Sequence, residues 1–337
     1  MDSINRVILD RVQRSFPIVP HPYRALAEGL EISESEALER IGSLKRNRVI
    51  RQISAIFNTG ALGYRSSLVA MAVPQEALDR AAEVVNAYPG VSHNYLRPAN
   101  FNMWFTIAVP PGKDLDAVVS ELSARAGGFP ALVLPALKKY KLAGVLDVLE
   151  EGDWEAGEEK AKLAPTESAS SFKPTPANIA IVKCIQEDLP LVQNPFALWA
   201  DSLKMSESEL LEVVSAWMEQ GAIRRFAAVL NHRQVGFQAN GMVVWNCPAE
   251  RIDAIGALLA SSPEVSHCYS RPAFPPQWPY NLYAMIHARS AEQCETIANR
   301  LADAANLDNF RIFFSTREYK KIRLKLFWDQ VGQAIGF

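Results

Sequence analysis

The sequence predicts an α+β protein built as a tandem duplication, in which each copy joins a helix-turn-helix unit to an α/β sandwich. The first observation is an internal repeat: residues 49–64 (VIRQISAIFNTGALGY) match residues 222–237 (AIRRFAAVLNHRQVGF) at an offset of 173. The second is a change of period within each copy, from the helical spacing of apolar residues to alternation. Because the repeat covers nearly the whole chain, we expect one architecture twice.

The N-terminal part of each copy is predicted to be helical. Helical spacing of apolar residues covers residues 4–14, 22–30 and 33–45. Ser33 precedes the third of these helices and Glu36 follows three residues later, which is the pattern of a capping box. Three short helices joined by tight turns are typical of a helix-turn-helix.

The rest of each copy is predicted to be a sandwich of strands and helices. In the first copy, strand-like alternation covers residues 51–57, 66–73, 92–97, 102–109 and about 131–134, with helices at 75–87 and 115–126. This order, β-β-α-β-β-α-β, is close to a ferredoxin-like sandwich.

The repeat also predicts the domain boundaries. The first half spans residues 1–149, with its helix-turn-helix at 1–50 and its sandwich at 51–149, and the second spans 178–337, divided into 178–223 and 224–337. Residues 150–177 between the halves are rich in charge, Ser, Ala and Pro, which is typical of an exposed linker.

Composition excludes several classes of protein. The formal net charge is -2, from 35 basic and 37 acidic side chains, so the chain as a whole does not attract nucleic acid or an anionic membrane. No run of apolar residues reaches the length of a membrane span, and we expect a cytoplasmic protein. The four cysteines are far apart, so we expect neither a disulfide framework nor a metal site.

The most distinctive feature is a stretch that occurs twice: VSHNYLRP at 91–98 and VSHCYSRP at 265–272. On a strand, alternate side chains share a face, so the His, Tyr and Arg of each stretch project together. The residues between them point the other way and differ between the copies, as Asn94 and Leu96 are replaced by Cys268 and Ser270. One face therefore keeps its identity while the other changes.

From the third helix into the first strand, the two copies read SESEALERIGSLKRNRVIRQISAIFN and SESELLEVVSAWMEQGAIRRFAAVLN. These two segments resemble the junction of helix, wing and strand in the Lrp/AsnC family, whose members join a winged helix-turn-helix to a small α/β sandwich and pair through the sandwich. The two His-Tyr-Arg stretches look like the signature of an enzymatic branch of that family, the sirohaem decarboxylases. The resemblance covers both halves.

The resemblance implies an enzyme, a carboxy-lyase that removes two acetate carboxyl groups of sirohaem as CO2. The product would be didecarboxysirohaem, on the route to haem d1 or to haem by an alternative pathway. It implies no cofactor beyond the iron tetrapyrrole substrate, since the conjugated ring itself delocalises the negative charge left by CO2. Enzymes of this branch often consist of two related subunits, so this chain looks like a fused form with an intrachain pseudo-dimer. Further association as a homo-oligomer is left open.

Sirohaem bears several carboxylates on a flat ring, so its site requires cations and apolar walls. The candidate catalytic residues are His93 and His267, as proton donors or as iron ligands, with Tyr95 and Tyr269 to orient them or to contact a carboxylate. The candidate substrate-binding residues are Arg97, Arg271, Arg51, Arg224, Arg225, Lys138, Lys141 and the ring of Trp104. No residue is assigned to a resident metal.

The alternative is a ligand-responsive transcription regulator, and charge argues against it. The helix expected at 206–220 carries four glutamates and no basic residue, although duplex binding depends on cations that neutralise phosphates. We therefore do not expect DNA to be a partner. A third alternative is a carrier that binds the tetrapyrrole without chemistry. His21, His232 and His287 are set aside, because none keeps its identity in the other copy.

Overall fold

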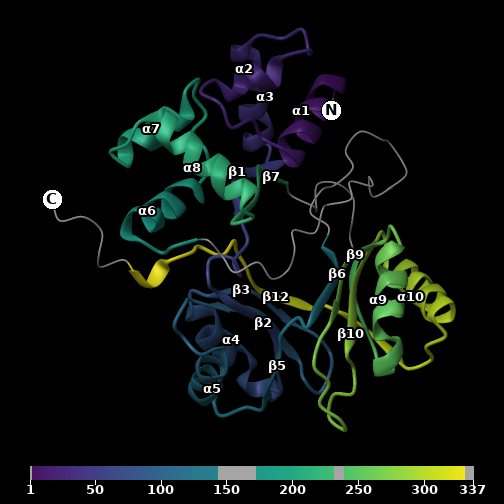
Figure 1. Ribbon diagram of the computed structural model, residues 1–337. Coiled ribbons are helices and arrows are strands. Elements are labelled where there is room, and N and C mark those ends of the chain that lie inside the picture. The colour runs from purple at the N-terminus through teal and green to yellow at the C-terminus, as the bar shows by residue number, and fades with distance from the viewer. Residues whose placement is uncertain (1, 143–171, 231–238, 331–337) are drawn as a thin grey trace. The chain divides into compact units, whose positions relative to one another are not determined.

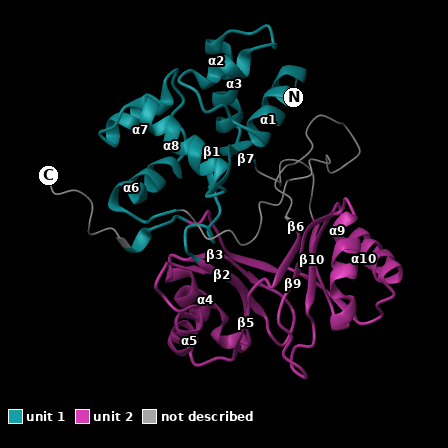
Figure 2. Cartoon of the chain, viewed as in Figure 1, with its two compact units in different colours: residues 1–64, 145–234, 325–337 teal, residues 65–144, 235–324 magenta. Residues whose placement is uncertain are grey.

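The structure is a computed structural model that describes residues 2–142, 172–230 and 239–330 of the chain. It divides into two compact units (Figure 2): unit 1 comprises residues 1–64, 145–234 and 325–337, and unit 2 comprises residues 65–144 and 235–324. Each unit therefore contains corresponding segments of both sequence copies. Most of the predicted linker at 150–177 lies outside the described residues. None of the helices in the described part is long and apolar enough to cross a membrane.

Unit 1 contains the two predicted sets of three helices. They are α1 (Ser3–Arg14), α2 (Pro22–Ala27) and α3 (Glu34–Arg46) in the first copy, and α6 (Pro176–Ile185), α7 (Pro195–Ser202) and α8 (Glu207–Glu219) in the second. The predicted capping box at Ser33 forms only in part: its side chain accepts from the Glu36 N–H, but the Glu36 carboxylate accepts from Arg40. The reciprocal box forms in the second copy, between Ser206 and Glu209.

The first strand of each copy lies in unit 1 rather than in a sandwich. β1 (Ile50–Phe57) and β7 (Ile223–Leu230) form a two-stranded antiparallel sheet with each other. The loop that follows the first helix of each copy also bonds to the first strand of the other copy. The Phe16 N–H donates to the Phe226 carbonyl of β7, and the Leu189 N–H donates to the Ile53 carbonyl of β1, both at 2.8 Å. Alternation identified both strands, but it does not identify the partner of a strand.

Unit 2 contains two five-stranded antiparallel sheets (Figure 1). The first has the order β12-β3-β4-β2-β5 and the second the order β11-β8-β10-β9-β6. The strands are β2 (Arg65–Met71), β3 (Val91–Leu96), β4 (Met103–Val109), β5 (Ala131–Leu134), β6 (Lys138–Leu142), β8 (Ala239–Trp245), β9 (Val265–Ser270), β10 (Leu282–Ala288), β11 (Phe310–Phe314) and β12 (Arg317–Lys321). The order β5-β2-β4-β3, connected by two helices, is the ferredoxin-like arrangement that the sequence predicts.

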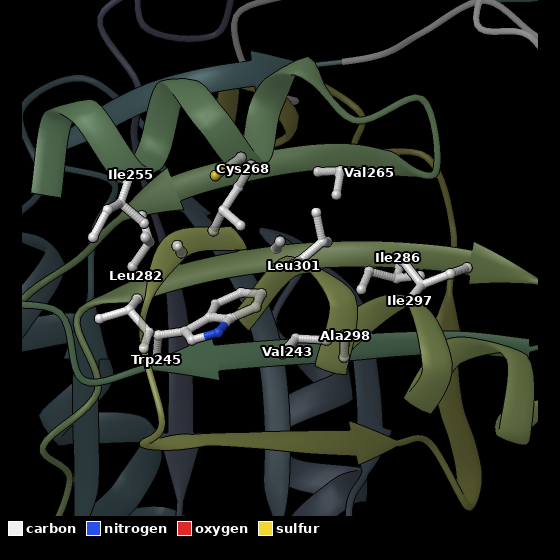
Figure 3. Close-up of a cluster of buried hydrophobic side chains, with 14 of the residues drawn as sticks. Val243, Trp245, Ile255, Val265, Cys268, Leu282, Ile286, Ile297, Ala298 and Leu301 are labelled. Carbon is white, nitrogen blue, oxygen red and sulfur yellow. The ribbon is translucent and has the colours of Figure 1, made fainter. Parts of the chain in front are cut away.

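Helices cover one face of each sheet. They are α4 (Leu78–Ala87) and α5 (Leu115–Ala126) on the first sheet, and α9 (Ile252–Ser261) and α10 (Ala291–Ala305) on the second. Short 3-10 turns occur at Gln75–Ala77, Ala249–Arg251 and Trp328–Gln330. Figure 3 shows the hydrophobic core of the second sheet, where Trp245, Cys268 and Leu282 pack beneath α9 and α10.

A third cluster of buried side chains joins the helix-free faces of the two sheets. It includes Trp104 and Leu134 from the first sheet and Val244, Tyr283 and Phe313 from the second. The sheets therefore pack face to face inside unit 2, with helices on the outside of both. This is the pairing through the sandwich that the predicted intrachain pseudo-dimer requires.

The last strand of each copy is exchanged. β6 follows the first sandwich in sequence but pairs with β9 of the second sheet, and β12 pairs with β3 of the first sheet. These two strands were not predicted, because charged side chains dominate both segments and no alternation of apolar residues is visible in them. Each exchanged strand covers the edge that its host sheet would otherwise expose.

Candidate active site

The two His-Tyr-Arg stretches lie on the helix-free faces of the two sheets of unit 2. On β3, Tyr95 pairs with Trp104 of β4, and on β9, Tyr269 pairs with Tyr283 of β10. Trp104 and Tyr283 both belong to the cluster between the sheets, and paired residues on antiparallel strands point to the same side. The alternation predicted for both stretches is confirmed, since Leu96 packs into the core under the helices of the first sheet and Cys268 packs under α9 on the second.

The rings of each stretch contact one another. The ring centroids of His93 and Tyr95 are 6.1 Å apart, and those of His267 and Tyr269 are 6.2 Å apart. The guanidinium of Arg97 lies 5.8 Å from the Tyr95 ring. The structure therefore brings these predicted site residues together in two matching groups.

A β-bulge precedes each histidine and adds a serine to its group. The strand pairing is interrupted between Val91 and His93 in β3 and at the matching place in β9, so one extra residue is accommodated. In each case it is a serine whose hydroxyl contacts the neighbouring imidazole: Ser92 Oγ lies 2.9 Å from His93 Nδ1, and Ser266 Oγ lies 2.8 Å from His267 Nδ1. The sequence signal was present, because both copies read Val-Ser-His, but the bulge was not predicted.

The second group has one more histidine. Ser266 Oγ also lies 2.6 Å from Nε2 of His287 on β10, and His287 Nδ1 lies 2.5 Å from Oδ1 of Asn240 on β8. The sequence comparison set His287 aside because its counterpart is Ala108. Only the pairing of β9, β10 and β8 brings these side chains together, so a criterion of symmetry misses this residue.

The two arginines reach across from one sheet to the other. Arg97 Nη1 donates to the Phe313 carbonyl at the end of β11, at 2.9 Å, and Arg271 Nη1 donates to the Leu134 carbonyl at the end of β5. Burial lowers the pKa of Arg97 to about 10 and lowers that of Arg271 as well. The Nε atom of each is buried and has no hydrogen-bond partner among the described residues. Each guanidinium is therefore a desolvated cation whose Nε–H can still donate a hydrogen bond.

The two lysines predicted to bind substrate contact the protein itself. Lys138 lies on β6 and pairs with Asp253 of α9 at 2.9 Å, while Lys141 donates to the Ser262 carbonyl at 2.7 Å, and burial lowers its pKa. The matching residues on β12 make the matching contacts: Arg317 pairs with Asp79 and Lys320 donates to the Tyr88 carbonyl. Both lysines therefore stabilise the packing of the exchanged strand β6, and this structural role accounts for the presence of cations at the matching positions of both copies.

The predicted aromatic wall is a packed cluster. Trp104 is 1% exposed, its indole N–H donates to the Phe101 carbonyl at 2.7 Å, and its ring lies 5.1 Å from that of Trp278. Trp278 lies in residues 274–281 (FPPQWPYN), where the second copy has extra residues relative to the first, and its indole N–H donates to the Tyr283 hydroxyl at 2.6 Å. These aromatic side chains hold the two sheets together beside the His-Tyr-Arg groups.

The remaining predicted residues lie elsewhere. Arg51, Arg224 and Arg225 are on β1 and β7 and belong to unit 1, whereas both His-Tyr-Arg groups belong to unit 2. Their roles in substrate binding stay predictions. His232 lies outside the described residues. Within the described ranges, no group of three or more His, Cys, Asp or Glu side chains is arranged to hold a metal ion.

Two family models match the chain, each of them twice. One, described as an AsnC-like ligand binding domain, matches residues 61–141 and 234–320, and the other, described as a "Siroheme decarboxylase NirDL-like HTH domain", matches residues 5–51 and 178–224. A siroheme decarboxylase of Hydrogenobacter thermophilus is 38% identical over 325 residues, which cover 96% of this chain and 95% of that protein. The chain belongs to the siroheme decarboxylase family. The predicted family and fold class are thereby confirmed.

Other members of the siroheme decarboxylase family show how the halves are distributed. The siroheme decarboxylase beta subunit of Methanosarcina barkeri is 41% identical over 149 residues, which cover 44% of this chain and 97% of that subunit. A crystal structure of the siroheme decarboxylase NirDL in co-complex with an iron-uroporphyrin III analogue matches with a TM-score of 0.77 at 34% identity, covering 96% of this chain and 94% of the other. Two halves that are separate subunits in some relatives are joined here.

Proposed function

We propose that this protein is a sirohaem decarboxylase, a carbon-carbon lyase that removes two acetate carboxyl groups of its substrate as CO2 to give didecarboxysirohaem. The observation that carries the proposal is the relationship to a siroheme decarboxylase over 96% of this chain and 95% of that protein. The two matching His-Tyr-Arg groups support it, because they supply the side chains that the reaction requires. A cytoplasmic location, expected from the sequence, is part of this proposal.

The reaction breaks the bond between the acetate methylene carbon and its carboxylate carbon. The electron pair of that bond stays on the methylene carbon next to the conjugated ring, CO2 leaves, and a proton from the enzyme converts the methylene into a methyl group. Charge and atoms balance with one proton consumed per CO2 released. The macrocycle delocalises the transient negative charge, so the proposal includes no cofactor beyond the iron tetrapyrrole substrate.

The protein's part in this reaction is to bind, to exclude water and to deliver the proton. His93 and His267 are the proton donors or iron ligands, and a positioned general acid contributes about 10²- to 10⁴-fold to a rate. The rings of Tyr95 and Tyr269 lie tilted beside these imidazoles and orient them. Partial burial of both groups between the sheets removes water from a departing carboxylate, which favours its loss as neutral CO2.

Arg97 and Arg271 bind the carboxylates that remain. A buried cation without a carboxylate partner is unfavourable, and no salt bridge to either arginine occurs in the described part of the chain. An anionic substrate offsets this cost, and each guanidinium still has its Nε–H to donate. The desolvation that lowers the pKa of both arginines is therefore the physical basis for tight binding of a polycarboxylate.

Regulation of transcription is disfavoured by the surface of α8. Glu209, Glu212 and Glu219 are exposed on this helix, which contains no lysine or arginine. Such a helix repels the phosphates that a recognition helix must approach. An electrophoretic titration with genomic fragments at low salt is expected to give no discrete complex.

The test of the proposal is anaerobic incubation of the purified protein with sirohaem, followed by mass spectrometry of the extracted pigment. Stepwise loss of two carboxyl groups without any added cofactor is the expected result. An unchanged pigment that nevertheless shifts its absorption in the presence of the protein would indicate a carrier instead, and no binding at all would overturn the proposal.

A further inference from the structure

The exchanged strands β6 and β12 carry basic residues at matching positions, and two of these matching pairs have a structural role. Lys138 and its counterpart Arg317 each form a salt bridge with an aspartate of a helix. Lys141 and its counterpart Lys320 each donate to a backbone carbonyl near the C-terminal end of a helix. These contacts hold the exchanged strands against the helices, so they account for the cations that both copies keep.

Lys321, the last residue of β12, does not belong to this pattern. Its counterpart in the first copy is Leu142, the last residue of β6. The Lys321 side chain is exposed and has no hydrogen bond or salt bridge to a described residue. A lysine on an edge strand discourages pairing with another molecule, but β6 is equally an edge strand and carries leucine at this position. The charge at position 321 is therefore not required for strand exchange or for protection of the edge.

The strand register places Lys321 directly opposite His93. The two residues are Cα partners in the antiparallel pairing of β12 with β3, and the Cβ atoms of such partners are about 4.5 to 5.5 Å apart. The preceding residue, Lys320, extends to the helix side of the sheet, where its ammonium donates to a carbonyl of α4. Because successive side chains on a strand point to opposite faces, Lys321 lies on the helix-free face with the first His-Tyr-Arg group.

The two His-Tyr-Arg groups therefore have different charged neighbours on the exchanged strands. Opposite the histidine, the first group has Lys321 and the second has Leu142. Opposite the tyrosine, the first group has Glu318 and the second has Lys139. A flat substrate with carboxylates around its rim cannot make the same contacts with both groups, because the cations of the edge strand lie at different places.

We propose that Lys321 is a substrate-binding residue of the first site and binds a carboxylate of the tetrapyrrole beside His93. This role rests on the proposed function. The ammonium is a point charge on a flexible four-carbon stem, so it reaches a carboxylate over the neighbouring strand without a fixed orientation. The carboxylate is one that the substrate keeps, because a cation on the departing carboxylate would stabilise its charged form and oppose the loss of neutral CO2. The second site has no cation opposite its histidine, so the two sites are not interchangeable.

The contact is tested by reductive methylation of lysine side chains in the full-length protein, with and without saturating sirohaem, followed by peptide mass spectrometry. Lys321 is expected to be methylated in the free protein and protected when sirohaem is bound. Lys113, exposed in the turn between β4 and α5, is the matched control and should react equally in both samples. Equal methylation of Lys321 with and without bound sirohaem would overturn the proposal.

The contribution to affinity is tested by anaerobic absorption titration of variants with sirohaem. Lys321→Leu introduces the residue of the other copy and is expected to weaken one phase of the titration by about 10-fold, the effect of losing one charge-assisted hydrogen bond. Lys321→Arg keeps the charge and should bind nearly as the wild type does. Lys113→Leu removes the same charge elsewhere and should leave the titration unchanged; an equal loss in this control would attribute the effect to net charge and overturn the contact.

The remaining outcomes separate this proposal from the proposed function. Because Lys321 contacts no described residue, Lys321→Leu should keep the wild-type urea midpoint, and a clearly lower midpoint would show a structural role instead. If the wild-type protein decarboxylates sirohaem and Lys321→Leu binds it with wild-type affinity, the role of Lys321 is wrong and the proposed function stands. If the wild-type protein neither binds nor decarboxylates sirohaem, the proposed function fails and the role of Lys321 fails with it.

Discussion

Replacement of Arg97 by methionine tests whether its buried charge is held ready for a ligand. The Arg97 side chain is 6% exposed, donates to the Phe313 carbonyl and lies near the Tyr95 ring. Methionine keeps much of the aliphatic volume and removes the charge and all donors. The substitution therefore separates the cost of burying a cation from the contacts that the cation makes.

The structure gives the expected size of the effect. Burial lowers the Arg97 pKa from its ordinary value to about 10, which at about 1.4 kcal/mol per pH unit corresponds to about 3 kcal/mol of unfavourable free energy for the charged form. Loss of the hydrogen bond to the Phe313 carbonyl destabilises the folded variant by about 1 to 3 kcal/mol. The two effects oppose one another, so the free energy of unfolding of Arg97→Met should lie between the wild-type value and about 2 kcal/mol above it.

Urea denaturation measures this change in the ligand-free protein, and thermal denaturation with and without sirohaem measures the effect of the ligand. A ligand at a hundredfold excess over its Kd stabilises the folded state by about 2.7 kcal/mol. The wild-type protein should gain stability of this order, and Arg97→Met should gain clearly less, because a carboxylate of the substrate has lost its partner.

Two results would refute the reasoning. A loss of about 3 to 5 kcal/mol in the ligand-free variant is the cost of breaking a buried ion pair, and it would mean that the charge is already compensated. Undiminished stabilisation by sirohaem would mean that Arg97 binds no carboxylate. Arg300→Met is the control: Arg300 forms an exposed pair with Glu264 at 2.6 Å, so its loss should cost at most about 1 kcal/mol and leave the ligand effect intact.

Three further predictions concern the histidines and the exchanged strand. His93→Ala or His267→Ala should leave the circular dichroism spectrum unchanged and lower decarboxylation turnover by about 10²-fold or more. Gly256→Ala should destabilise the fold by about 1 to 3 kcal/mol in urea, because the added Cβ would lie 2.5 Å from ring carbons of Tyr140 on β6. Hydrogen bonds from Lys138 and Tyr140 hold the pKa of Asp253 below its ordinary value of 3.8. The ionised carboxylate therefore stabilises the fold above pH 3.8, and this stabilisation is lost as the pH falls through the folded-state pKa. The urea midpoints of wild type and Asp253→Asn should converge as the pH falls through that folded-state pKa.

Each of these has a contrary outcome. Wild-type turnover in the double histidine variant would remove both residues from the mechanism. For Gly256→Ala, the additional change Tyr140→Ala should relieve part of the loss, and strictly additive effects would show that the two sites are not in contact. A constant difference between the urea midpoints of wild type and Asp253→Asn across the acidic range would mean that the carboxylate is not stabilised in the folded state.

Much of the fold follows from the sequence because the period of apolar residues and the choice of capping residues are local properties. The helix at 115–126 and the strands at 103–109 and 131–134 lie where alternation and spacing place them. The strand at 138–142 was not predicted, because its charged residues show no alternation of apolar and polar side chains. The His-Tyr-Arg faces were found because a duplicated chain shows which face keeps its residues.

By itself, the sequence determined the duplication, the order of the elements, the family and the shared face of each His, Tyr and Arg. Only the tertiary structure decided which strands are neighbours: β6 and β12 exchange sheets, and β1 and β7 pair with each other. It also decided that His287 meets Ser266 and that Arg97 reaches the carbonyl of Phe313, 216 residues away. The physical reason is that alternation fixes the face of a side chain, while its neighbours are fixed by strand pairing and by the packing of one sheet on another.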